Sequence, residues 1–363
     1  MEAGDSAARG IKRVYPDAEV LVRPLADGGE GTVEALTLGC GGEMCEVAVT
    51  GPLGAPVKCR YSVVNSTKTA IIEMAGAAGI TLISEKDRNP LYTTSYGVGE
   101  VIAEAIAKGC RNFLVGIGGS ATNDGGIGML QALGFEMLNR DGKPVKFGAL
   151  GLEELAVIRE EHVLPALKEC RFKVICDVTN PLCGKQGSSA VYGPQKGADP
   201  AMIAQMDQWL ADYAGLAGEN HPNASPDKPG AGAAGGLGFA FMTFLNAALE
   251  SGIQVVLEET GLRDYVKNAD IVITGEGRLD GQTVMGKAPV GVAGIAKEYG
   301  KPVLAFSGCV AEGAEGCNEN GIDAFFPILR GVTGLEEAMN KENASANMAD
   351  AVEQVFRLIR AFE

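Results

Sequence analysis

The feature that most constrains the fold of this chain is a repeated order of apolar strand, glycine-rich turn and helix. Residues 112–117 form a β-branched and aromatic run that leads into the glycine-rich segment 116–128 and a predicted helix over 127–133. Further along, the apolar run 270–274 leads into a second glycine-rich segment and a predicted helix over 288–299. This alternation is typical of a parallel sheet with crossover helices. The sequence therefore predicts an α/β protein whose ligands bind beyond the carboxyl ends of the strands.

Other segments add to this pattern. Further strands are predicted over residues 18–24, 172–176 and 303–307. Residues 50–70 combine prolines and glycines with alternating apolar positions, which predicts an antiparallel hairpin. The uncharged stretch 229–249 starts with glycine and alanine, too poor in large apolar groups for a membrane span. We expect it to open a buried helix that ends near residue 250.

The chain is long enough for two domains, since it has 363 residues. We predict two different α/β domains, one of them Rossmann-like with a largely parallel sheet. Residues 1–50 together with 262–363 are expected to form the Rossmann-like domain, and residues 51–261 the second one. The chain would then cross between the domains more than once.

Composition excludes several functional classes. The net charge of −15 disfavours binding to nucleic acid or to an anionic membrane, because both rely on clustered Lys and Arg. Only two histidines occur, which argues against a Ser-His-Asp hydrolase or a histidine metal site. The nine cysteines form no C-x-x-C pair, and we expect incidental thiols in a cytoplasmic protein. The 51 glycines gather in loops, which favours an enzyme over a structural protein.

The loop 116–128 is the first candidate site. It follows a strand and opens a helix, so its N–H groups and the helix dipole suit an anion such as phosphate. Candidate phosphate-binding residues are Gly118, Gly119, Ser120, Thr122 and Asn123. Asp124 is placed to face a metal ion. The alternative is that the glycines only allow a tight turn.

The segment 275–287 is the second candidate site. Residues 281–287 fit the spacing G-x-x-x-x-G-K, but Ala288 replaces the hydroxyl residue of a P-loop and the loop starts too far beyond its strand. Four charged residues nevertheless gather just past a buried strand: Glu276, Arg278, Asp280 and Lys287. The alternative is an ordinary solvated loop.

Three further segments carry polar residues suited to Mg²⁺ or phosphate. Asp27 lies in the run Asp-Gly-Gly-Glu-Gly-Thr, Asp177 follows the strand predicted over 172–176, and Lys196 lies between helix breakers. For each of these, a turn or a helix N-cap is the competing interpretation.

Together these segments resemble the type I glycerate kinase family, bacterial enzymes that phosphorylate D-glycerate with ATP. The matching stretches are residues 24–32, 88–94, 116–128, 176–182, 193–198, 230–236 and 270–293. The resemblance implies two α/β domains with the active site in the cleft between them. It also implies ATP and Mg²⁺, D-glycerate as the substrate, and phosphorylation at the 2-hydroxyl rather than the 3-hydroxyl.

On this resemblance we assign hypothetical roles to the candidate residues. Asp177 and Glu276 would contact Mg²⁺ and phosphate, while Lys196 and Lys287 would stabilise the transferred charge. Arg278 would grip the glycerate carboxylate. Asp27 or Asp280 would orient the hydroxyl group. The nucleotide would lie on Gly118, Gly119, Ser120, Thr122, Asn123, Gly235 and Gly236.

One departure from the family pattern keeps other functions open. Family members open with a strand and a turn of the type A-P-D-S-F-K, whereas this chain begins inside the helix that should follow. A ligand-binding or catalytically impaired family member is therefore one alternative. A kinase of a related small hydroxy acid is another, and a dehydrogenase is more distant. No pattern in the sequence predicts an oligomeric state.

Overall fold

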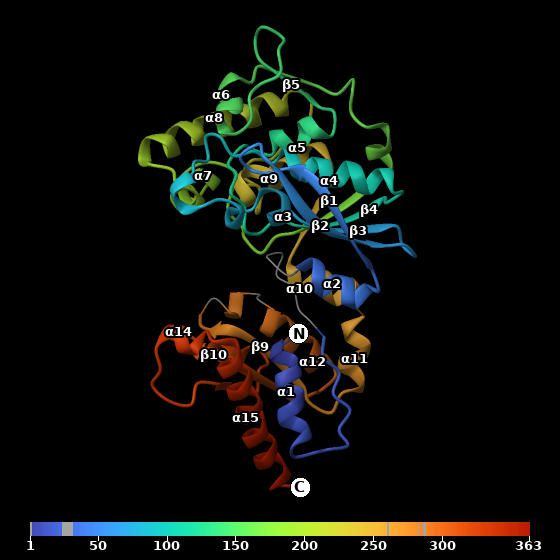
Figure 1. Cartoon of the computed structure of the whole chain (residues 1–363), viewed down its shortest axis with the longest axis vertical. Helices are drawn as coiled ribbons and strands as arrows, with labels where there is room; N and C mark the ends of the chain where they lie inside the picture. Colours follow the sequence, from blue (N-terminus) through green and yellow to red (C-terminus); the bar gives the residue numbers. More distant parts are fainter. Residues whose placement is uncertain (1, 24–31, 260, 282, 286–287) are drawn as a thin grey trace. The chain divides into compact units, whose positions relative to one another are not determined.

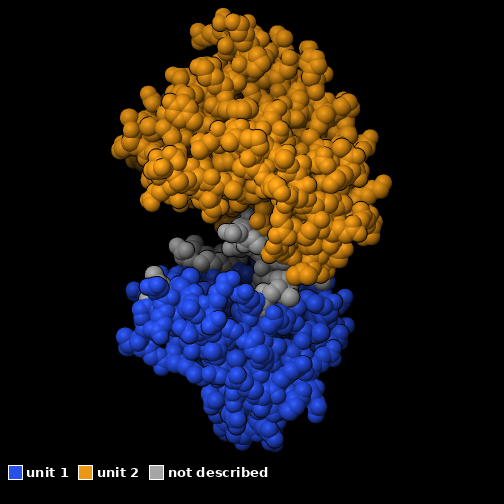
Figure 2. All heavy atoms as spheres, viewed as in Figure 1, with its two compact units in different colours: residues 1–26, 253–363 blue, residues 27–252 orange. Residues whose placement is uncertain are grey.

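The computed structural model describes residues 2–23, 32–259, 261–281, 283–285 and 288–363 (Figure 1). The chain divides into two compact units, coloured separately in Figure 2. Unit 1 comprises Met1–Ala26 and Ile253–Glu363, and unit 2 comprises Asp27–Gly252. The chain thus passes from one unit to the other after residues 26 and 252. The domain boundaries expected from the sequence come after residues 50 and 261. Within the described part of the chain, no helix combines the length and apolar character that crossing a membrane requires.

Unit 2 contains a six-stranded mixed sheet in the order β1-β2-β3-β4-β7-β8. Its strands are β1 (Glu43–Thr50), β2 (Pro56–Val64), β3 (Thr69–Glu73), β4 (Asn112–Gly116), β7 (Arg171–Ile175) and β8 (Ala248–Glu250). The antiparallel hairpin predicted within residues 50–70 corresponds to β2, which is antiparallel to β1 on one side and to β3 on the other. From β3 to β8 all neighbours are parallel. The carboxyl ends of these parallel strands therefore meet at one edge of the sheet.

Helices cover both faces of this sheet. They are α2 (Thr32–Cys40), α3 (Ala75–Ala78), α4 (Tyr96–Ala107), α5 (Ile127–Ala132), α6 (Ala149–Glu154), α7 (Ser188–Tyr192), α8 (Pro200–Gly218) and α9 (Ala233–Phe244). Ala70 and Ile72 of β3 face a large core shared with α4, α5 and α9, while α2 contacts β2 and β3. Ile71, between Ala70 and Ile72, is equally buried but is not part of that core. Successive side chains of β3 therefore pack on opposite faces of the sheet. A small hairpin of β5 (Glu136–Leu138) and β6 (Val157–Arg159) lies outside the main sheet.

Unit 1 is built on a three-stranded parallel sheet in the order β11-β10-β9. Its strands are β9 (Val272–Leu279), β10 (Val303–Val310) and β11 (Ala324–Pro327), and its helices are α1 (Glu2–Lys12), α10 (Gly252–Glu259, which starts at the unit boundary), α11 (Leu262–Asn268), α12 (Ala288–Glu298), α13 (Gly316–Glu319), α14 (Leu335–Ala338) and α15 (Lys341–Arg360). Val303 and Ala305 of β10 face a core with α11 and α12, whereas Leu304 and Phe306 face α1 and α15. The strand is apolar on both faces because helices cover both.

The predicted α/β class is confirmed, but three local predictions need correction. Residues 18–23 have no strand, because an apolar run forms a strand only where a partner is available to pair with its backbone. The helix after the glycine–alanine run ends at Phe244, and β8 follows where the helix was expected to continue. β9 runs on to Leu279, since β10 continues to pair alongside it.

Candidate active site

The glycine loop 117–126 of unit 2 begins at the carboxyl edge of the sheet. Gly116 of β4 pairs with Ile175 of β7. Gly118 and Asp177 each come two residues after this pair, just beyond the ends of neighbouring strands. Gly118 is half-buried and Gly119 is exposed, with the positive φ of 71° that glycine tolerates. From Ser120 onward the loop turns into the core. Of the glycines in the predicted phosphate loop, only Gly118 and Gly119 therefore reach the surface.

Five of the seven predicted nucleotide-binding residues are buried, namely Ser120, Thr122, Asn123, Gly235 and Gly236. Thr122 and Asn123 are fully buried, and Ser120 nearly so. The Asn123 amide donates to Ser189 Oγ at 2.9 Å and accepts from Ser188 Oγ at 3.2 Å. Gly235 O accepts a hydrogen bond from Gly125 N at 2.8 Å. Their assignment to ATP binding stays a prediction, and the contacts seen here hold the loop.

The carboxylate of Asp124, which we expected to face a metal ion, is buried among hydrogen-bond donors. Oδ2 accepts from both the backbone N and the Oγ of Ser95 at 2.8 Å, and Oδ1 accepts from Gly126 N at 3.1 Å. Burial raises the pKa of this carboxyl, and the donors from Ser95 oppose that rise. The carboxylate thereby ties the N-terminal ends of α4 and α5 together, where helix dipoles favour a negative charge.

Lys196 lies inside unit 2 rather than at its surface. It is only 2% exposed, and its Nζ donates to Thr122 O at 2.6 Å. Burial lowers its pKa to about 7, although the negative charge of Asp124 works in the opposite direction. Lys196 ends the 3₁₀ turn Pro194–Lys196, and Gly197 follows with a φ of 93°. In this arrangement the amino group holds protein backbone.

Gly235 and Gly236 interrupt the start of α9 with positive φ angles of 74° and 90°. A Cβ at Gly235 would lie 2.0 Å from Thr122 O, and one at Gly236 would lie 2.9 Å from Gly125 Cα. Both glycines therefore allow α9 to approach the loop 117–126 closely.

Asp177 lies exposed beyond the end of β7. Its Oδ1 accepts a hydrogen bond at 2.9 Å from the backbone N of Gly252, the first residue of α10. Asp177 thereby caps the N-terminal end of α10 from a segment 75 residues away, whereas the competing interpretation predicted a local turn or N-cap. A ligand role for Asp177 stays a prediction.

In unit 1, the charged segment lies at the carboxyl end of β9. Glu276 and Arg278 belong to the strand itself, opposite Ser307 and Cys309 of β10. The Thr283 hydroxyl donates to Glu276 Oε1 and accepts from Asp280 N, at 3.1 Å in the second case. One threonine thus links the two carboxylate-bearing positions. Alternation along β9 places Glu276 and Arg278 on the same face of the sheet.

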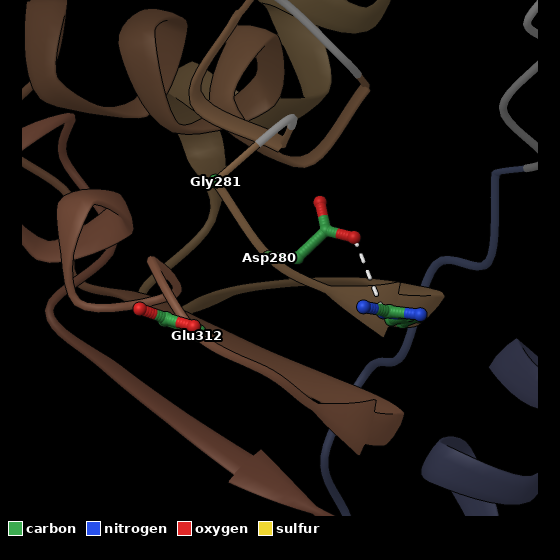
Figure 3. A pocket seen from close by; sticks show the side chains of 4 residues that line it. Asp280, Gly281 and Glu312 are labelled. Carbon is green, nitrogen blue, oxygen red and sulfur yellow. Dashed lines mark ion pairs between the residues drawn. The ribbon is translucent and has the colours of Figure 1, made fainter.

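An open pocket of about 520 Å³ lies beside this segment, lined by Arg278, Asp280, Gly281 and Glu312 (Figure 3). Arg278 Nε lies 3.2 Å from Asp280 Oδ2, and the Arg278 side chain is 65% exposed. Glu312, which we did not identify from the sequence, follows β10 by two residues. The signal that would have found it is the carboxyl-edge rule applied to β10, had its end been placed at Val310 instead of residue 307.

Comparison with known proteins fits these observations. Residues 1–360 match the glycerate kinase family. The chain belongs to the glycerate kinase family. It is 45% identical to a glycerate kinase of Haemophilus influenzae over 99% of this chain and 94% of that protein. It is 44% identical to the glycerate 2-kinase of Escherichia coli over 96% of this chain and 93% of that protein.

A solved structure agrees with this relationship. The crystal structure of a candidate glycerate kinase 2 from Salmonella typhimurium LT2 superposes with a TM-score of 0.87 at 43% identity, over 99% of this chain and 94% of that one. The resemblance predicted from sequence motifs is therefore confirmed. The chain is a glycerate kinase, a phosphotransferase that uses ATP.

The glycerate kinase brings its predicted site residues together in two groups. In unit 2, Lys196 and the paired glycines of α9 each contact the loop 117–126. In unit 1, Glu276, Arg278 and Asp280 lie on one strand end beside Glu312. Two further predicted residues, Asp27 and Lys287, lie outside the described residues.

Proposed function

We propose that this glycerate kinase transfers the γ-phosphoryl group of ATP to the 2-hydroxyl of D-glycerate in a Mg²⁺-dependent reaction. The observation that carries the proposal is the relationship to the Escherichia coli glycerate 2-kinase, which extends over nearly the whole of both chains. The open, charged pocket at the carboxyl edge of the unit 1 sheet supports it, since it offers both a cation and carboxylates to a small hydroxy acid.

In this proposal Arg278 binds the carboxylate of glycerate. The Arg278 side chain is largely exposed, and its Nε lies 3.2 Å from Asp280. The guanidinium has further N–H donors on its two Nη atoms, and these are the donors that we assign to glycerate. A planar fork of donors matches a carboxylate in two parallel hydrogen bonds. Asp280, 19% exposed and held against Arg278, then orients the reacting hydroxyl and accepts its proton.

Mg²⁺ fits the donors at the end of β9. Glu276, one of the two carboxylates assigned to Mg²⁺ from the sequence, provides carboxylate oxygens, and the Thr283 hydroxyl lies against its Oε1, so the donors are the hard oxygen ligands that Mg²⁺ prefers. Within the described ranges, no three His, Cys, Asp or Glu side chains gather as a metal cage. Mg²⁺ commonly binds through one or two carboxylates together with phosphate oxygens and water. When bound, it would neutralise charge on the transferred phosphoryl group.

The experiment that tests this function follows ADP release with D-glycerate, ATP and Mg²⁺. Enolase, pyruvate kinase and lactate dehydrogenase then consume the product, with no phosphoglycerate mutase added. We expect direct turnover by enolase, because enolase accepts 2-phosphoglycerate. ADP release that reaches enolase only after mutase is added would identify the 3-phosphate instead. Absence of ADP release with D-glycerate would reject the proposed substrate.

A further inference from the structure

The amino group of Lys196 occupies an unusual position for a lysine. It is 2% exposed, and within the part of the chain that the structure describes it makes one hydrogen bond, to Thr122 O at 2.6 Å. No ion pair joins it to a carboxylate among those residues, and Asp124 acts on it through its charge without a hydrogen bond. Burying a lysine away from a partner charge is costly, whereas a methionine would fill a similar space at no such cost. The N–H donor of Lys196 is therefore the feature that distinguishes it from an apolar residue of similar length.

The acceptor, Thr122 O, belongs to the loop whose first glycines reach the surface. The buried half of this loop, residues 120–126, is held by neutral contacts such as Thr93 Oγ1 to Ala121 O at 2.9 Å. Two charged groups hold it as well, with Asp124 bonded to the ends of α4 and α5, and Lys196 reaching Thr122 O from a segment 74 residues away. The hydroxyl Oγ1 of Thr122 is buried without a hydrogen-bond partner among the described residues. The hydrogen bond from Lys196 to the carbonyl O is therefore the polar contact that holds Thr122.

We propose that Lys196 is a positioning residue that holds Thr122 O and thereby presents Gly118 and Gly119 to the phosphates of ATP. This inference rests on the proposed function, and on the prediction from the sequence that this glycine loop binds the nucleotide. It replaces the surface role expected for Lys196 from the sequence, because an amino group bonded to a buried carbonyl does not contact a phosphate at the loop surface. Release of Thr122 O lets the loop sample other conformations, and the exposed glycines then bind ATP less often in the competent shape.

The test compares Lys196→Met, which keeps the length of the side chain but removes the donor, with Lys196→Gln, which restores an N–H donor. Lys185→Met is the matched control, because Lys185 is exposed in a neighbouring loop. Three quantities are measured on the full chain: the Kd of ATP by calorimetry, the KM for ATP with kcat, and hydrogen exchange of the amides in residues 117–126 without substrates. A melting curve for each variant establishes that it is folded.

For Lys196→Met we expect the Kd and KM of ATP to rise about tenfold, kcat to change by less than about threefold, and loop amides to exchange about tenfold faster. Lys196→Gln should recover part of each effect, and Lys185→Met should match the wild type. If Lys196→Met does not fold, the same readouts on Lys196→Gln decide, with smaller shifts in the same direction.

Two results would overturn the proposal. A kcat reduced about a hundredfold with unchanged Kd and unchanged loop exchange would mean that the amino group contacts the reacting phosphate. Faster exchange with an unchanged Kd of ATP would mean that Lys196 serves stability alone. Failure of the proposed function is separate, because it appears as a wild type without D-glycerate turnover. ATP binding and loop exchange can still be measured in that case.

Discussion

Arg278 and Lys196 are both basic residues, but their surroundings are opposite. Arg278 stands 65% exposed at the end of β9 beside Asp280, where a small anion can reach its guanidinium. Lys196 is enclosed, and its hydrogen bond goes to the backbone. The same difference separates two aspartates, since Asp280 lines a pocket while Asp124 is fully buried among donors. At the residue scale, burial therefore decides whether an ionisable side chain can bind a ligand or instead stabilises the fold.

The role proposed for Arg278 predicts a loss that charge alone cannot restore. Arg278→Met should raise the KM for D-glycerate about 10–100-fold, because it removes charge-assisted hydrogen bonds worth about 1.5–3 kcal/mol. Arg278→Lys should recover only part of this loss, since an ammonium lacks the planar fork. Steady-state kinetics measure both. Arg263→Lys, in an exposed ion pair with Glu298, is the control and should leave KM unchanged. An unaffected KM in Arg278→Met would reject the assignment.

The buried amine of Lys196 predicts a pH dependence of stability. Burial lowers its pKa from 10.5 to about 7 in the folded protein. Between these values the unfolded chain binds the extra proton, so the contribution of Lys196 to the free energy of unfolding rises with pH, by up to about 1.4 kcal/mol per pH unit. Urea denaturation of wild type and Lys196→Met should show a difference that shifts in favour of wild type between pH 7.5 and 10.

The comparison between the two proteins isolates this effect. Groups that titrate in both proteins contribute equally to the two stability curves, so their effects cancel in the difference. The exceptions are Asp124, which interacts with Lys196, and Tyr213, which interacts with Asp124; burial raises the pKa values of both. Those raised values keep Tyr213 neutral across the tested range. Parallel stability curves for the two proteins would show that Lys196 keeps an ordinary pKa inside the fold.

At the scale of elements, the start of α9 is shaped by contact with the loop 117–126. Gly235 has a φ of 74°, and its amide carbonyl accepts from Gly125 N at 2.8 Å. The preceding residue, Ala234, also has a positive φ, of 52°, although it carries a Cβ. Such a conformation in a non-glycine residue persists only where the surrounding contacts enforce it. The approach of α9 to the loop supplies those contacts.

This close approach predicts opposite effects for the same substitution at two glycines. Gly235→Ala should lower the free energy of unfolding by more than about 1 kcal/mol, because the residue needs a positive φ and its Cβ would lie 2.0 Å from Thr122 O. Gly215→Ala in α8 should raise it by up to about 1 kcal/mol, because that glycine is helical and its Cβ would meet no neighbour. Urea denaturation measures both. Equal effects at the two sites would contradict the packing argument.

At the scale of the whole molecule, each unit has its own buried core. The core of unit 2 lies between its sheet and the helices α4, α5 and α9, and unit 1 has one core on each face of its smaller sheet. Unit 1 is assembled from the two ends of the chain, which meet where α1 packs on α15. Gly10 permits that approach, since a Cβ there would lie 2.3 Å from Ala349 O. Unit 2 is the continuous segment between these ends.

The elements that were predicted correctly are those specified by a local pattern of adjacent residues. The strand predicted over 112–117 and the helix over 127–133 match β4 and α5 to within one residue at each end. The antiparallel strand after residue 50 was recognisable because an alternating run follows prolines and a glycine. Residues 18–24 looked similar, yet the described part of that segment forms no strand. A strand requires a pairing partner, and no local pattern specifies one.

The sequence by itself determined the α/β class, the glycine loops at the strand ends and the glycerate kinase family, because each follows from short runs of residues and their order. Only the tertiary structure decided which charges are buried. Lys196 reaches Thr122 across 74 residues, and Glu312 joins Arg278 and Asp280 because β10 pairs beside β9. Burial and proximity arise from packing between segments distant in the chain, so a motif identifies the residue types of a site while the fold assigns their roles.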